Sequence, residues 1–318
     1  MTYSGKVAVL FGGIGSEREV SLDSGRTVAD ALTSAGIETI AADITPEDLS
    51  ILDDNTIDAF FIMLHGIWGE DGQLQKILEQ KGLTFTGSGS KASQLAFDKG
   101  DSKKAFLSAG LPTLPYLAVG CDSDWGLTEK ELEIIGKKFV VKPACEGSST
   151  GIEIAEGIDE AIAAAKKCTA AYGKTVIEKY VKAREFTVGV LAGEALPIIE
   201  IRTKQAFYDY NAKYIADTTE YLFDTLEDKK IAADMSSAAL KCFEQLGCQG
   251  YARVDFLLTE DNKFYILEAN TIPGFTSHSL LPKAAAKRGY SLPELCEKIL
   301  ADALNTSSQL DAKHLSQS

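Results

Sequence analysis

The sequence predicts an α/β protein of two or three domains that begins with an open parallel sheet. Its 318 residues are enough to bury more than one core, and 45% apolar with 25% charged residues is typical of a soluble globular protein. A short apolar strand at Lys6–Phe11 leads through glycines into a helix. Near the C-terminus, two runs of aromatic and branched residues flank a turn at 259–262.

Composition argues against several classes of partner. The net charge is −14 and no basic patch is present, which argues against nucleic acid. The apolar run among the first residues is only five residues long, too short for a signal peptide, and no later stretch could span a membrane. The six cysteines lack metal-binding spacing, so we expect reduced thiols in a cytoplasmic protein.

The N-terminal segment predicts the parallel sheet and one edge of a site. The turn Gly13-Ile14-Gly15 lacks the third glycine of a dinucleotide fingerprint, so nicotinamide binding is only weakly indicated. Further strands are expected at 37–42 and 59–64, and the second leads to His65 at the carboxyl edge, where such sheets bind ligands. Glu17 and His65 are therefore candidate site residues, although each is equally consistent with a cap or loop residue.

The next segment predicts a phosphate-binding loop. A helix beginning near Asp98-Lys99 opens a central domain, in which Lys142 lies in the strand 139–143 and the small-residue loop 145–151 follows. A lysine and successive backbone N–H groups suit a triphosphate. The loop is not a Walker A loop, because no G-x-x-x-x-G-K-[ST] pattern occurs. The alternative is a flexible hairpin turn that binds nothing.

The C-terminal part predicts a third set of strands and a lid. Strands are expected at 175–181, 187–191 and 196–201, and helices at 231–246, 282–287 and 292–304. The stretch Arg202–Tyr221 has no clear periodicity, and a loop of this length is uncommon unless it is functional. We interpret it as a lid that carries Lys213 and Tyr214 toward the site. The polar tail 305–318 lacks an apolar face and is expected to be disordered.

The turn at 259–262 predicts a hairpin with a defined register. A two-residue loop at Asp261-Asn262, closed by Glu260 opposite Lys263, makes opposed residue numbers sum to 523. The apolar face then pairs Val254 with Ala269, Phe256 with Leu267 and Leu258 with Tyr265.

The polar face of the same hairpin predicts a metal site. Asp255 falls opposite Glu268, and Arg253 opposite Asn270. Opposed carboxylates destabilise a sheet unless a positive charge lies between them, and Mg²⁺ prefers carboxylate and amide oxygens. The predicted ligands are therefore Asp255, Glu268 and Asn270, with Arg253 beside them to hold phosphate or developing negative charge. The alternative is a solvated polar face.

Several blocks together resemble the D-alanine–D-alanine ligase family over roughly residues 5–304. They occur in family order and at family-like spacing. The blocks are Gly12-Gly13 with Glu17-Arg18-Glu19-Val20-Ser21, His65-Gly66 with Gly69-Glu70-Asp71-Gly72, Gly87-Ser88-Gly89 with Asp98-Lys99, Lys142-Pro143 with Glu146-Gly147-Ser148-Ser149, Tyr208-Asp209-Tyr210 with Ala212-Lys213-Tyr214, Arg253-x-Asp255, and Glu268-x-Asn270-Thr271-x-Pro273-Gly274 with Thr276-Ser277-His278-Ser279.

The resemblance implies an ATP-grasp fold of three α/β domains with a Rossmann-like N-terminal domain. The expected boundaries are 1–97 for the N-terminal domain, 98–182 for the central ATP-grasp subdomain, 183–304 for the C-terminal catalytic domain and 305–318 for the tail. It also implies a homodimer that joins two D-alanines, with ATP, for peptidoglycan precursor synthesis.

The resemblance further implies roles for individual residues. The nucleotide set is Lys99, Lys142, Glu146, Ser148, Ser149, Glu178, Lys179, Val181, Glu185, Lys213 and Asn270. Two Mg²⁺ ions, replaceable by Mn²⁺, would be held by Asp255, Glu268 and Asn270. The catalytic set is Glu17, Ser148, Tyr214, Arg253, Gly274 and Ser279. The substrate-binding set is Glu17, His65, Lys213, Tyr214, Ser279 and Leu280.

Three rivals remain at this stage. The nearest is another ATP-grasp carboxylate–amine or D-alanine–D-lactate ligase; Tyr214 favours the dipeptide-forming members. A non-catalytic nucleotide sensor on the same fold is disfavoured by the intact set Asp255, Glu268 and Asn270. A nicotinamide dehydrogenase is disfavoured by the incomplete glycine fingerprint.

Overall fold

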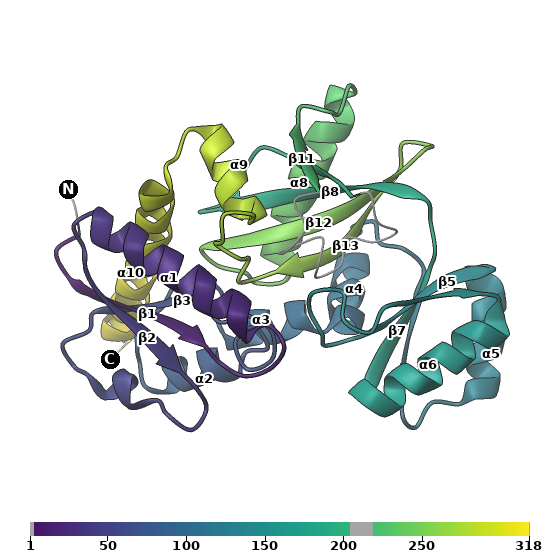
Figure 1. Ribbon diagram of the computed structural model, residues 1–318, viewed down its shortest axis with the longest axis horizontal. Helices are drawn as coiled ribbons and strands as arrows, with labels where there is room; N and C mark the ends of the chain where they lie inside the picture. Colours follow the sequence, from purple (N-terminus) through teal and green to yellow (C-terminus); the bar gives the residue numbers. More distant parts are fainter. Residues whose placement is uncertain (1–2, 204–218, 318) are drawn as a thin grey trace.

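The structure is a computed structural model that describes residues 3–203 and 219–317, with side chains up to residue 306. Within these residues the strands form three sheets. Figure 1 shows the four-stranded sheet with α5 and α6 at one end of the molecule, the N-terminal sheet with α1 and α10 at the other, and the six-stranded sheet between them.

The N-terminal sheet is parallel, as predicted, with strand order β2-β1-β3. Its strands are β1 (Lys6–Gly12), β2 (Glu38–Ile44) and β3 (Ala59–Ile62), and its neighbouring helices are α1 (Arg18–Ser34), the short 3₁₀ helix η1 (Ser50–Asp53), α2 (Gln73–Gln80) and α3 (Ser90–Phe97). Central strand β1 is almost wholly buried because helices cover both faces, which explains its continuous apolar run. Gly25 lets α1 approach the sheet, since an added Cβ there would overlap the Phe11 ring.

The four-stranded sheet has the order β4-β7-β5-β6 and is antiparallel. Its elements are β4 (Tyr116–Gly120), α5 (Trp125–Ile135), β5 (Lys138–Pro143), β6 (Glu153–Glu156), α6 (Ile158–Tyr172) and β7 (Lys174–Lys179). Helix α4 (Lys99–Ser108) precedes them, and its Phe106 packs in the core of the six-stranded sheet. The predicted strands at 139–143 and 175–181 are confirmed as β5 and β7 with small shifts at their ends. A small separate core under α5 and α6, including Leu132, Phe139 and Ile177, holds this unit together.

The six-stranded sheet has the order β11-β10-β8-β12-β13, with β9 paired to β8. Its elements are β8 (Ala183–Leu191), β9 (Glu194–Ala195), β10 (Ile199–Arg202), β11 (Glu220–Phe223), α8 (Lys229–Gln245), β12 (Tyr251–Thr259), β13 (Phe264–Asn270), α9 (Leu280–Arg288) and α10 (Leu292–Gln317). Most of the predicted lid, including Lys213 and Tyr214, lies outside the described residues. The two ends of the predicted lid are strands instead: Arg202 ends β10, and Tyr221 belongs to β11, which pairs with β10.

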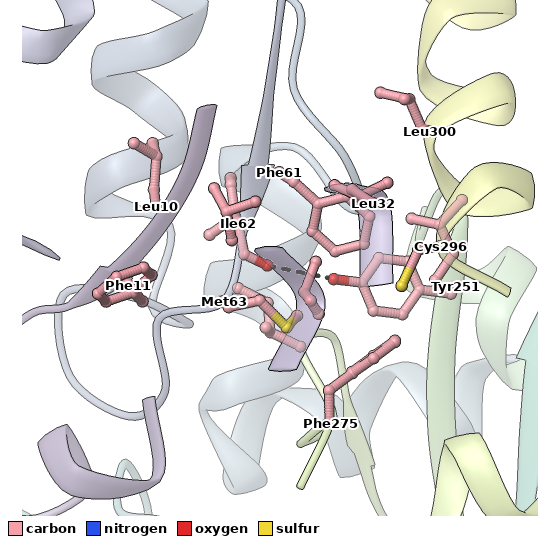
Figure 2. Packing of buried hydrophobic residues seen from close by; sticks show 14 of the residues in the cluster. Leu10, Phe11, Leu32, Phe61, Ile62, Met63, Tyr251, Phe275, Cys296 and Leu300 are labelled. Carbon is pink, nitrogen blue, oxygen red and sulfur yellow. Dashed lines mark hydrogen bonds between the residues drawn. The ribbon is translucent and has the colours of Figure 1, made fainter. Parts of the chain in front are cut away.

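One continuous core joins the N-terminal sheet to the C-terminal part of the chain. Figure 2 shows Tyr251, fully buried, donating a hydrogen bond from its hydroxyl to the Ile62 carbonyl oxygen over 3.3 Å. Phe275 meets both Phe61 and Tyr251 edge-on, at ring separations of 6.3 and 6.1 Å. The N-terminal and six-stranded sheets therefore pack as one body, whereas the four-stranded sheet keeps its own core; the domain boundaries themselves stay a prediction.

The hairpin register is confirmed near the polar residues and wrong near the turn. Arg253 pairs with Asn270, Val254 with Ala269 and Asp255 with Glu268, as predicted. The loop has three residues rather than two, because Thr259 and Lys263 close it and Asn262 takes a φ of +61°. Phe256 therefore pairs with Ile266 and Leu258 with Phe264.

A β-bulge reconciles the two parts of the hairpin. The register shifts by one residue between Asp255 and Phe256, so Leu267 is the extra residue of β13. The shift compensates for the longer loop and returns Asp255 to the position opposite Glu268. Leu267 lines a cavity beside the four-stranded sheet instead of pairing with Phe256 on the apolar face, so the bulge also shapes this cavity.

The polar C-terminal tail is helical rather than disordered. Helix α10 runs from Leu292 to Gln317, although the sequence predicts that it ends at residue 304. Residues 305–317 contain no proline or glycine, so nothing in them stops a helix that is already started by its packed first turns. In the described part of the chain no helix is long and apolar enough to cross a membrane.

Candidate active site

A cavity of about 530 Å³ lies between the four-stranded and six-stranded sheets. It gathers most of the residues predicted to bind nucleotide. Those that line it are Lys99, Lys142, Glu146, Ser148, Ser149, Glu178, Lys179, Val181 and Glu185. Asn270 does not line it, and Lys213 lies outside the described residues. Glu268, a predicted metal ligand, also lines the cavity, so this face of the hairpin borders the nucleotide set.

The predicted phosphate loop is held by Lys99. Its Nζ donates to the Glu146 carbonyl oxygen over 2.6 Å and lies 3.5 Å from a Glu268 carboxylate oxygen. Ser148 and Ser149 have φ values of +50° and +59°. Two consecutive non-glycine residues in the left-handed region cost on the order of 1–2 kcal/mol each, and such strain clusters at functional sites. The loop is therefore a folded feature, not a simple hairpin turn.

The strained loop contacts the N-terminal sheet's first turn. The Ser148 hydroxyl donates a hydrogen bond to Glu17 Oε1. Gly147 packs against the same carboxylate, because an added Cβ would lie 2.5 Å from Glu17 Oε2. Glu17 is only 7% exposed. Two residues 131 positions apart in the chain thus meet, as the predicted catalytic set requires.

A buried ion cluster lies on the floor of the cavity. Glu178 Oε1 is 2.8 Å from Lys142 Nζ and 3.1 Å from Lys103 Nζ. Burial opposes the ionisation of Glu178, but the two ammonium groups outweigh it and lower the pKa of its carboxyl. Burial also lowers the pKa of Lys103, to about 8, against the pull of Glu178.

The metal end of the site lies on β12 and β13. Asp255, 4% exposed, accepts from both arms of the Arg253 guanidinium at 2.9 and 2.8 Å. Thr187 donates its hydroxyl to Asp255 over 2.6 Å, and the Asn270 amide donates over 3.1 Å. A buried carboxylate needs this compensation in the absence of another cation.

The donor set fits a hard divalent cation. Asp255 and Glu268 supply carboxylate oxygens from opposed positions, and Asn270 uses its amide nitrogen on Asp255, which leaves its carbonyl oxygen as a further donor. Arg253 on Asp255 and Lys99 near Glu268 provide the positive charge that these carboxylates require. No cluster of three His, Cys, Asp or Glu side chains occurs among the described residues, so a metal here would depend on the amide and on its own waters or phosphates.

The opposite end of the site lies where the first and last sheets pack together. His65 Nε2 is 3.1 Å from the Ser24 hydroxyl, which accepts from the Phe275 N–H over 3.1 Å. The Ser24 proton is then available to His65, which suits a neutral imidazole. Burial lowers the pKa of His65 to about 4.

Three further predicted residues follow one another along the segment after β13, and the first of them, Gly274, lies near Ser24. Gly274 precedes Phe275, and an added Cβ on it would lie 2.9 Å from Ser279 Oγ. Ser279 accepts from the Thr276 N–H over 2.9 Å and directly precedes α9, whose first residue is Leu280.

The comparisons with known proteins identify the family. A family model described as D-ala D-ala ligase C-terminus matches residues 106–301. A D-alanine–D-alanine ligase of Saccharophagus degradans is 42% identical over 300 residues, covering 94% of this chain and 95% of the relative. One of Anaeromyxobacter is 43% identical over 298 residues, covering 94% and 96%. This chain belongs to the D-alanine–D-alanine ligase family.

Solved structures of the family share the fold. The crystal structure of the D-alanine–D-alanine ligase from Bacillus anthracis complexed with ATP has a TM-score of 0.84 and 31% identity, covering 96% of this chain and 99% of that one. A second structure of that enzyme has a TM-score of 0.86 with 33% identity, at the same coverage. The predicted ATP-grasp fold is therefore confirmed for this member of the D-alanine–D-alanine ligase family.

Several residues of this ligase-family site escaped the sequence analysis. They are Ser24, Glu70, Lys103, Thr187 and Glu200. Ser24 was detectable as a polar residue on the apolar stripe of α1, and Lys103 as the residue one helical turn after Lys99. Thr187 and Glu200 gave no signal, because only strand pairing brings Thr187 beside Asp255 and Glu200 beside Phe186.

Glu70 is the most unusual of these residues. Its carboxylate accepts from the Gly66 N–H over 2.9 Å and the Ile272 N–H over 3.4 Å, which ties the first sheet's loop to the metal strand's end. Burial, followed by the charge of Glu17, raises the pKa of its carboxyl to about 8. The sequence block Gly69-Glu70-Asp71-Gly72 located it but gave it no role.

Proposed function

We propose that this protein joins two D-alanines to D-alanyl-D-alanine and converts ATP to ADP and phosphate. The supporting observation is the contact between Ser148 and Glu17. Ser148 lines the cavity that gathers the predicted nucleotide residues, whereas Glu17 opens the helix that follows the first glycine turn. This contact joins a place for ATP to a place for an amino acid. The names of the relatives supply the substrate.

The reaction needs activation of a carboxylate. A carboxylate resists attack by an amine because it is anionic and oxide is a poor leaving group, so transfer of the terminal phosphoryl group to the first D-alanine must come first. In this proposal Lys99 and Lys142 hold the phosphates, and the loop with Ser148 and Ser149 covers them. Two Mg²⁺ ions held by Asp255, Glu268 and Asn270 would neutralise phosphate charge during the transfer.

Attack by the second amine produces a negative oxygen that requires stabilisation. Arg253 and the Gly274 N–H are assigned this task from the family resemblance. Arg253 lies on Asp255, and Gly274 directly precedes Phe275, whose N–H donates to Ser24. Glu17 is assigned the ammonium of the first D-alanine, and Ser279 with Leu280 the carboxylate of the second. Lys213 and Tyr214 are proposed to complete the site from the lid.

The remaining assignments follow from this activity. We propose a homodimer in the cytoplasm, where ATP is supplied, that provides the dipeptide for peptidoglycan precursors. The family relationship supports these assignments. Size-exclusion chromatography with light scattering measures the molar mass in solution and so tests the dimer. A monomer mass at micromolar protein concentration would contradict it.

The decisive experiment measures phosphate release from MgATP with D-alanine, with L-alanine, and with D-alanine plus D-lactate, and identifies the products by mass spectrometry. We expect D-alanyl-D-alanine from the D-amino acid and one phosphate for each peptide. A depsipeptide product would favour the D-lactate alternative. If no phosphate is released with any of these acceptors, the protein acts on another substrate or is a nucleotide sensor.

A further inference from the structure

Lys103 is a fully buried charged residue for which the proposed mechanism has no use. It lies on α4, one turn after Lys99, and is 0% exposed. Its Nζ is 3.1 Å from Glu178 Oε1 and donates to the Thr113 hydroxyl over 2.8 Å. Thr113 in turn donates to the Ile266 carbonyl oxygen of β13 over 3.0 Å, so the lysine is fixed between two sheets. A buried ammonium carries a desolvation cost that pairing only partly offsets, so its presence here calls for an explanation.

Lys103 shares its carboxylate partner, Glu178, with Lys142. Both ammonium groups approach the same oxygen of Glu178, Lys142 at 2.8 Å and Lys103 at 3.1 Å. Lys142 lines the cavity, whereas Lys103 is not among the lining residues. Without Lys103, the charge of Lys142 would be cancelled by Glu178 before any ligand arrived.

A charge count makes the same point for the ion pairs formed by Lys99, Lys103 and Lys142. The carboxylates in these pairs are Glu178 and Glu268. Three positive and two negative charges leave a net charge of +1 in a region of low dielectric constant. Removal of the Lys103 charge leaves zero, although no atom that lines the cavity has changed. The Tyr116 ring, 5.6 Å from Lys103 Nζ, adds no formal charge.

We propose that Lys103 is a positioning residue for nucleotide phosphates: it occupies Glu178, so that the ammonium of Lys142 acts on the ligand with its full charge. This inference rests on the proposed use of ATP at the same cavity. It predicts a selective effect. Binding of a phosphate-bearing nucleotide depends on Lys103, whereas binding of the bare nucleoside does not.

The test compares ADP with adenosine, each titrated calorimetrically into the purified full-length protein. For Lys103→Met we expect ADP to bind about tenfold more weakly, because one net charge is lost at short range in a poorly screened site. Adenosine should bind within about twofold of wild type. Lys104→Met is the matched control: it is the next residue of α4, but it is exposed and pairs with Asp101 over 2.8 Å. Both ligands should bind it as they bind wild type.

A second variant tests whether Lys103 acts through Glu178. Glu178→Gln alone raises the net charge, and combined with Lys103→Met it restores +1. The ratio of ADP to adenosine affinity should therefore rise in the single Gln variant and return to about the wild-type value in the double variant. Because ADP and adenosine carry the same base, any effect of a direct contact between Glu178 and the base cancels in the ratio of their affinities.

The outcomes separate this inference from the proposed function. Equal weakening of ADP and adenosine in Lys103→Met, or a double variant no better than Lys103→Met, would overturn the role of Lys103. If Lys103→Met does not fold, the Glu178→Gln and double variants decide by the same ratio. A wild-type protein that binds neither ligand would instead contradict the use of ATP itself.

Discussion

The two ends of the candidate site are built in different ways. At the metal end, Arg253, Asp255, Glu268 and Asn270 lie on two adjacent strands of one hairpin, and their hydrogen bonds join residues at most 15 positions apart. At the other end, the proposed D-alanine end, Glu17 meets Ser148 from a different sheet unit, and Ser24 meets His65 and Phe275. The first end depends on strand register, and the second on the packing of distant parts.

This difference bears on how each end should respond to change. The metal end holds several charges close together, so loss of one carboxylate should abolish chemistry and leave the fold intact. The D-alanine end includes the contact between two parts of the molecule. One is the four-stranded sheet, which has its own small core, and the other is the body formed by the N-terminal and six-stranded sheets. Changes there should weaken substrate binding and stability together.

The largest expected effect is at the metal end. Glu268→Gln keeps the shape of the side chain but removes the charge opposite Asp255, and we expect turnover to fall about a thousandfold or more. Phosphate release measured over a range of Mg²⁺ concentrations checks this, together with an unchanged melting temperature. Glu260→Gln, in the exposed hairpin loop, is the control and should keep full activity. Near-normal rates for Glu268→Gln would remove the metal assignment.

An intermediate effect is expected where the two units meet. Ser148→Ala removes the hydrogen bond to the Glu17 carboxylate, and hydrogen bonds to charged groups contribute about 1.5–3 kcal/mol. The kcat/KM for D-alanine should therefore fall about tenfold to a hundredfold, while ADP affinity measured by calorimetry changes little. If the variant loses ADP affinity but keeps its kcat/KM for D-alanine, Ser148 serves the phosphates alone.

The smallest effect is a pH dependence of stability at the D-alanine end. The pKa of His65 is lowered to about 4 in the folded protein from an ordinary value of 6.5. Between these values the unfolded chain binds a proton that the folded protein does not, so stability is lost as the pH falls from 6.5 toward 4. His65→Asn should lessen this loss by on the order of 1 kcal/mol between pH 7 and pH 5.

Urea unfolding of both proteins at the two pH values measures this difference. If the difference in unfolding free energy between the wild type and the variant were the same at both pH values, His65 would titrate in the usual range. That result would also contradict the neutral imidazole inferred from the Ser24 hydrogen bond.

The sequence by itself determined the parallel first sheet and the hairpin with Asp255 opposite Glu268, whereas most of the nucleotide set came from the family resemblance and its role stays a prediction. These features depend on local rules: the period of apolar residues, the glycine turns and the alternation of strand faces. The same rules failed at the hairpin loop, because a two-residue loop and a three-residue loop with a compensating bulge place Asp255 identically. They failed again at the tail, where composition suggested disorder but the helix continues.

Only the tertiary structure decided the remaining features. It placed Ser148 on Glu17, made one core of the first and last sheets, and buried Lys103 beside Glu178. None of these follows from neighbouring residues, because contacts between residues far apart in the chain are set by how the sheets pack. The burial of a charged residue such as Lys103 can be predicted only when its charged partners are known. It depends on their combined charge and not on the helix propensity of the lysine itself.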